Sequence, residues 1–116
     1  MSVNKIILLG YVGNDPEMRY PEKDFAIARF SLATSEPKGA SGVEITGWHT
    51  CILTGRNAVV AERYVRKGSR VYVEGKMRYR EFEDRYKIKR RVAEVEVAYI
   101  ELLGQSVSQQ STTRGL

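Results

Sequence analysis

Apolar and polar residues alternate with a period of two along several stretches of this chain, and that alternation predicts β-strands. In the stretch 43–54 it places Trp48 and Thr50 on one face and His49 and Cys51 on the other. Clusters of Gly, Pro, Asn, Asp and Ser interrupt the pattern and indicate turns. Five strands are predicted in this way, over residues 3–13, 25–34, 43–54, 69–82 and 92–103.

The first of these stretches departs from clean alternation. Its apolar run from Ile6 to Leu9 predicts a strand that is covered on both faces. A turn follows it, because Pro16 fixes φ and Asp15 can bond the backbone ahead of it. Asp15 and Glu17 could be an acid and base pair, but turn chemistry accounts for both residues.

One segment follows helical spacing instead. A short helix is predicted over residues 56–68, because apolar residues recur at helical intervals at Ala58, Ala61 and Val65. Asn57 is the predicted N-cap, and Gly68 stands where a left-handed residue would end the helix.

The order of these elements predicts the fold class. Three strands, one helix and two strands in about a hundred residues predict an all-β, five-stranded Greek-key OB-fold barrel, with the helix between strands 3 and 4. Gly75, in the middle of a strand, marks a bend or bulge. Residues 1–103 are predicted to form one domain, and the polar residues 104–116 a flexible tail unless a neighbour holds them.

Charge is unevenly distributed along the 116 residues, whose formal net charge is +5. Residues 56–91 hold 13 of the 19 Lys and Arg residues against five acids, a local net of +8. The rest of the chain is therefore at −3. Such asymmetry favours a polyanion that binds on one side of the molecule.

The basic stretch combines cations with an aromatic ring. Period two predicts that one strand face carries Lys76, Arg78, Arg80 and Phe82. Phosphates need the cations and an unstacked base needs a flat apolar partner, so this face suits single-stranded nucleic acid better than a duplex. A solvated hairpin with ordinary Lys and Arg residues is the alternative.

The sequence gives little support for catalysis or metal binding. His49 and Cys51 share a face, but zinc takes three or four protein ligands, and these are the only His and Cys residues. Packing or subunit contact is the preferred interpretation, and no metal, cofactor or enzymatic activity is expected. The apolar run Ile6 to Leu9 is too short for a signal peptide or membrane span, so a soluble, cytoplasmic protein is expected.

The chain also resembles the bacterial-type single-stranded DNA-binding proteins over roughly residues 3 to 103. Each matching motif is short, but their joint order and spacing are specific. The motifs are Asn4–Gly10, Gly13 with Asp15–Glu17, Arg19–Tyr20, Leu32–Glu36, Trp48–His49, Leu53 with Gly55, Tyr64–Ser69 and Val71–Arg78.

The resemblance implies an OB-fold homotetramer, associated with the bacterial nucleoid, that wraps single-stranded DNA without reading sequence in DNA replication, recombination and repair. It implies no enzymatic activity. Trp48 matches a stacking tryptophan, Phe82 stands where the family often has another ring, and His49 matches a subunit contact. The cations expected at DNA are Arg78 and Arg80 on the strand, Arg56 and Lys67 beside the helix, and Lys76 and Lys5.

Three departures from the family pattern modify these expectations. Aromatic residues are missing at Thr54 and in the loop at Pro37 and Lys38, which predicts weaker or more salt-sensitive binding. The turn after Phe82 lacks glycine and leads into further cations, which predicts a steep loss of affinity with salt. Residues 105–116 contain no acid, as in a truncated or naturally short form, so docking of replication and repair enzymes is not assigned.

Two other classes remain open. A primosome-type adaptor would share the fold and act chiefly by contacting proteins, and the missing aromatic residues favour it. A sequence-tolerant RNA binder would use the same cations and rings. An enzyme is the least supported class. Preference for oligo-dT over duplex would distinguish a single-stranded DNA-binding protein from an adaptor, which should bind DNA weakly.

Overall fold

The computed structural model describes residues 1–104, so the predicted tail lies, apart from Gly104, outside the described residues. The elements in chain order are β1 (Ile6–Val12), β2 (Glu17–Glu22), β3 (Phe25–Lys38), the 3-10 turn η1 (Gly39–Ser41), β4 (Val43–Thr54), α1 (Gly55–Tyr64), β5 (Arg70–Glu83) and β6 (Lys89–Leu103). Across these residues, no helix has the length and apolar character needed to cross a bilayer.

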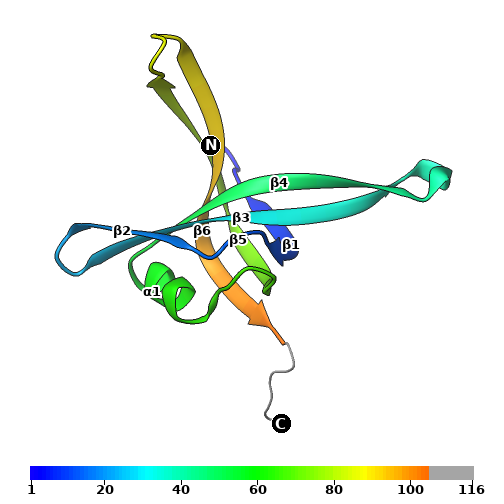
Figure 1. Cartoon of the computed structure of the whole chain (residues 1–116), viewed down its shortest axis with the longest axis horizontal. Coiled ribbons are helices and arrows are strands. Elements are labelled where there is room, and N and C mark those ends of the chain that lie inside the picture. Colours follow the sequence, from blue (N-terminus) through cyan, green and yellow to red (C-terminus); the bar gives the residue numbers. More distant parts are fainter. Residues whose placement is uncertain (105–116) are drawn as a thin grey trace.

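Five of the strands close into a barrel (Figure 1). The sheet order is β1-β5-β6-β4-β3-β2, and a further pairing of β1 with β3, at Tyr11 with Ala33, closes the ring. β4 and β6 pair in parallel through Cys51 and Val95, whereas their other neighbours are antiparallel. The five-stranded OB-fold barrel with a helix before its fourth strand is therefore confirmed.

One strand outside the barrel, β2, was not predicted from the sequence. It pairs with the outer edge of β3 and leaves nearly all of its side chains exposed. Without a buried face it has no apolar alternation, and Pro21 lacks the N–H that an interior strand would need. It widens the outer face of the barrel beside β3.

Alternation along β3 and β4 builds the core. Phe30 and Leu32 of β3 and Leu53 of β4 are almost completely buried. Burying side chains of this size contributes about 1.5–3 kcal/mol each. The residues between them point outward, so the two strands present an outer face of mixed polar and apolar side chains over a closed apolar interior.

β1 corrects one expectation. Its side chains alternate between the core and solvent, and Ile7, Leu9 and Tyr11 are exposed in the single chain. The prediction that both faces of this strand are covered is therefore wrong for the chain taken alone. Alternate residues of the apolar run lie on two different surfaces, one that packs in the core and one on the outside of the barrel.

The predicted apolar face of the helix is confirmed, but its predicted ends are wrong. Ala58 and Ala61 are fully buried against the barrel. Thr54, not Asn57, is the N-cap residue, and it makes no side-chain capping bond. Asn57 lies inside the helix, where its side chain donates to the carbonyl of Ala98 at 3.2 Å and so ties the helix to β6.

Gly68 lies beyond the helix, which ends at Tyr64. It does adopt the left-handed conformation, with φ of +91°. Its backbone N–H donates to the carbonyl of Val12 at 2.7 Å, so the turn joins the segment after the helix to the end of β1. The requirement for glycine was predicted correctly, but its role in ending the helix was wrong.

Two hairpins extend beyond the barrel as arms (Figure 1). In one, β3 pairs with β4 as far as Lys38 and Val43, and in the other β5 pairs with β6 as far as Glu83 and Lys89. The register of the second arm shifts at Gly75, which confirms the predicted bulge. A Cβ at Gly75 would lie 2.1 Å from the carbonyl oxygen of Glu96, so only glycine fits there.

Candidate nucleic-acid interface

A hollow of about 550 Å³ separates the outer face of the barrel from the arm formed by β5 and β6. The barrel contributes Arg29 of β3 and Ile52 of β4, and the arm contributes Arg80 and Phe82 of β5. Cations, an aliphatic surface and an aromatic ring therefore meet in one groove. These are the groups that phosphates and unstacked bases require.

Trp48 lies on the strand face that forms this groove. It is two residues from Thr50 and four from Ile52 on β4, so all three side chains point the same way. Its side chain is 63% exposed, which excludes a core position. A Cβ at Gly13 would lie 2.5 Å from Cζ3 of Trp48, so the indole rests on the turn after β1 and glycine leaves room for it.

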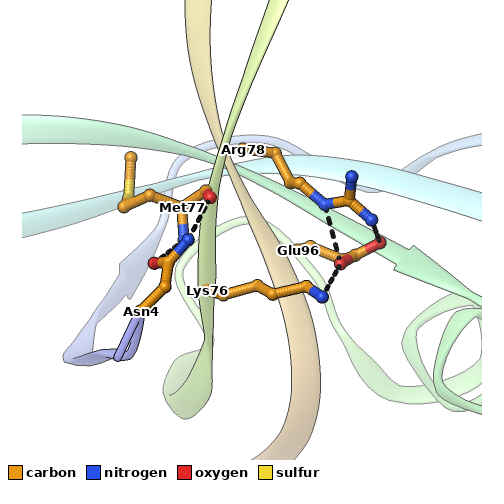
Figure 2. A network of polar contacts seen from close by, with 5 residues as sticks. All are labelled: Asn4, Lys76, Met77, Arg78 and Glu96. Carbon is orange, nitrogen blue, oxygen red and sulfur yellow. Dashed lines mark hydrogen bonds and ion pairs between the residues drawn. The ribbon is translucent and has the colours of Figure 1, made fainter. Parts of the chain in front are cut away.

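The cations of β5 share one face, as predicted, but they are not free. Figure 2 shows Arg78 and Lys76 converging on Glu96 of β6. Nε and one terminal nitrogen of Arg78 donate to the two carboxylate oxygens of Glu96 at 3.0 and 3.2 Å. Nζ of Lys76 lies 3.5 Å from Oε1 of the same carboxylate. The hydrogen bond from Arg78 lowers the pKa of the Glu96 carboxyl group.

Arg80 repeats this arrangement one step further along the arm. It donates to both carboxylate oxygens of Glu94, at 3.4 and 3.0 Å. The hydrogen bond to Glu94 raises the pKa of Arg80. The Arg80 guanidinium carbon also lies 5.4 Å from the centre of the Phe82 ring, within the range of a cation–π contact.

Asn4 fixes the backbone between Lys76 and Arg78. Its side chain donates to the carbonyl of Met77 at 2.9 Å and accepts from the N–H of Met77 at 3.0 Å (Figure 2). β1 begins only at Ile6, so it offers the backbone of Met77 no partner. The amide side chain of Asn4 makes the hydrogen bonds that such a backbone partner would make. The base of the arm is therefore anchored where its cations begin.

The other predicted DNA contacts lie apart from the groove. Lys5 is paired with Glu74 at 3.6 Å and lines a neighbouring hollow of about 470 Å³ together with Lys76. Arg56 is exposed on the first turn of α1, and Lys67 is exposed in the turn that follows the helix. Neither of these two residues lines the groove or the hollows that hold Lys76 and Arg78.

His49 points away from Trp48, as the period of two predicted. Its Nε2 lies 2.9 Å from Oγ1 of Thr34, and the ring is half-buried. The predicted role of His49 in subunit contact remains a prediction. Within residues 1–104, no group of three or more His, Cys, Asp or Glu side chains is placed to hold a metal ion.

Cys51 is unsuited to nucleophilic chemistry. It is completely buried, and burial raises the pKa of its thiol to about 12. Because only a thiolate attacks, we expect Cys51 in the native protein at pH 8 to react with a disulfide reagent at least about 100-fold more slowly than in urea. Absorbance during labelling measures both rates, and rapid labelling of the native protein would contradict its burial.

Several groove residues were missed from the sequence. Arg19 of β2 and Arg29 of β3 lie outside the basic stretch that drew attention. Alternation along residues 25–34 would have placed Arg29 on the outer face, because Ala28 and Phe30 beside it are buried. Tyr79 was also missed: it is exposed on the other face of the arm, with Arg91 4.8 Å from its ring centre.

A closed five-stranded barrel with a cationic and aromatic groove along one sheet face defines a nucleic-acid-binding type of OB-fold protein. The sequence profile of the Single-strand binding protein family matches residues 3–103, and the chain belongs to that family. The resemblance identified from the sequence is confirmed.

Two known proteins show the extent of the similarity. The single-stranded DNA-binding protein of Bacteroides thetaiotaomicron is 40% identical over 109 residues, which cover 89% of this chain and 67% of that protein. A solved structure, a Plasmodium falciparum SSB complex with ssDNA, matches with a TM-score of 0.80 and 31% identity. That match covers 90% of this chain and 97% of the Plasmodium chain.

Proposed function

We propose that this chain binds single-stranded DNA without reading its sequence and protects it during DNA replication, recombination and repair. The observation that carries the proposal is the outer face of the barrel, where Arg80 and Phe82 line the groove and Trp48 stands exposed beside it. Membership of the Single-strand binding protein family supports it. A cytoplasmic, nucleoid-associated location belongs to the same proposal.

The mechanism follows from the arrangement of rings and cations. Bases stack on Trp48 and Phe82, and phosphates lie along Lys76, Arg78 and Arg80. Every base offers a flat face, so stacking tolerates any sequence. A duplex keeps its bases stacked on one another, so only a single strand can use both rings. No catalytic step is part of the mechanism.

Self-association completes the proposal. Four copies are proposed to assemble, with His49 and the exposed outer face of β1 as contact surfaces. A tetramer presents four grooves to one strand, and linked sites bind far more tightly than isolated ones. Docking of replication and repair enzymes is not part of the proposal.

The test uses Trp48, the only tryptophan, as its own reporter. Its fluorescence is followed while the protein is titrated with oligo-dT or with duplex DNA, at low and at high salt. We expect strong quenching by oligo-dT alone, and an affinity that falls as salt rises. Equal affinity for duplex would contradict the proposal, and weak binding of every nucleic acid would favour an adaptor that acts through a protein partner.

A further inference from the structure

Two carboxylates of β6, those of Glu94 and Glu96, lie on the same face of the arm as the cations of β5. In the pairing of β5 with β6, Lys76 stands directly opposite Glu96 and Arg78 directly opposite Glu94. The arginines reach diagonally, so that Arg78 binds Glu96 and Arg80 binds Glu94. Each cation that the sequence assigned to phosphate on this strand is therefore already bound to a carboxylate.

Folding stability alone gives little reason for these pairs. About half of each cationic side chain is exposed, so water and salt screen the pairs from that side and reduce their contribution to stability. What distinguishes Glu94 and Glu96 is where they lie relative to the groove. Glu94 lines the groove beside Phe82, with a side chain only 13% exposed, and Glu96 lines an adjoining hollow with Arg78.

A carboxylate and a phosphate compete for the same atoms of arginine. Both accept two parallel hydrogen bonds from a guanidinium group, and both carry negative charge. A phosphate that reaches the groove or the adjoining hollow must take Arg80 or Arg78 from its carboxylate, or share it. The displaced or shared carboxylate then stands close to the phosphate and repels it.

The turn of the same arm offers a useful contrast. Asp84 also pairs with an arginine, Arg90, at 2.9 Å. Its carboxylate accepts backbone hydrogen bonds from Tyr86 and Ile88 as well, so it builds the turn. Among the described residues, Glu94 and Glu96 make hydrogen bonds and ion pairs through their carboxylates to cations alone, and no turn or cap depends on them.

We propose that Glu94 and Glu96 act as internal counter-anions, which occupy the phosphate-binding atoms of Arg78, Arg80 and Lys76 in the free protein and thereby limit its affinity for single-stranded DNA. This inference rests on the proposed function. The carboxylates hold the long cationic side chains above the groove until DNA arrives. They also favour release, because they regain the cations when a phosphate leaves.

The test compares Glu94→Gln, Glu96→Gln and the double variant with the original chain. Glutamine keeps the shape of glutamate and removes its charge. If each carboxylate cancels about one phosphate contact, each substitution tightens binding of oligo-dT about five-fold at 0.1 M salt and steepens the slope of log affinity against log salt by about 0.7. All four curves should converge near 1 M salt.

Glu62→Gln is the matched control. It removes the same charge from α1, where Glu62 accepts a hydrogen bond from Tyr20. We expect its affinity to stay within about two-fold of the original, because Glu62 lines neither the groove nor the adjoining hollow and its exposed charge is screened by salt. An equal gain in the control would show an effect of net charge and would overturn the inference.

The remaining outcomes separate this inference from the function on which it rests. Equal or weaker binding by folded Glu96→Gln, with an unchanged salt slope, would overturn the role of the carboxylates while single-stranded DNA binding stands. Failure of the original chain to bind oligo-dT would overturn the proposed function itself. The Glu96 side chain is 43% exposed, so this variant decides the question even if Glu94→Gln fails to fold.

Discussion

Replacing both groove-side rings, in the double variant Trp48→Ala with Phe82→Ala, is expected to weaken binding of oligo-dT by at least about 30-fold. Stacking contributes about 1–3 kcal/mol per base, so two rings account for about 2–6 kcal/mol of binding free energy. Both side chains are exposed in the free chain, so the free energy of unfolding should change by less than about 1 kcal/mol.

Anisotropy of a fluorescently labelled oligo-dT measures this loss, because the double variant no longer carries its own reporter. Tyr64→Ala is the matched control: its ring is as exposed as that of Trp48 but belongs to α1. We expect the control to bind normally. If the double variant remains folded and keeps its affinity, bases do not stack on this face and the proposed binding path is wrong.

Alternation within most strands, together with the place of the helix in the order of elements, was enough to predict the barrel. Inward residues such as Phe30 and Leu53 alternate with outward ones, and the same period separated the face of Trp48 from that of His49. Period two works here because each barrel strand buries one face. It failed for β2, which buries almost nothing and so leaves no apolar signal.

The candidate site was harder to predict, because charge counted along the chain differs from charge in space. The basic stretch was counted over residues 56–91, and Glu94 and Glu96 lie just outside it. The register of the β5–β6 arm brings both acids back beside Arg78 and Arg80. The prediction that the cations share one face is therefore confirmed, but their partners depend on how the hairpin folds.

Arg29 illustrates a second limit. It stands alone between apolar residues in the sequence, so no local charge pattern marks it. The structure places it in the groove because β3 and β4 lie side by side, with Arg29 opposite Ile52. A site assembled from several strands becomes visible only when their register is known.

Leu9→Glu is expected to break the proposed tetramer without unfolding the chain. Ile7, Leu9 and Tyr11 form an exposed apolar row on β1, and Leu9 pairs across the sheet with Tyr72 of β5. An exposed apolar row of this kind supports the proposed contact surface. In the proposed tetramer, a carboxylate at this position would be buried in the interface of every copy, and burying an unpaired charge costs several kcal/mol.

Light scattering at micromolar concentration measures this effect. We expect the mass of four chains for the original protein and a smaller assembly for Leu9→Glu. Val59→Glu is the matched control, because Val59 on α1 is 41% exposed and Leu9 is 45% exposed. If Leu9→Glu keeps the full mass, the outer face of β1 is not a subunit contact. If the original protein has the mass of a single chain, the tetramer itself is excluded, and the row on β1 must serve another purpose than self-association.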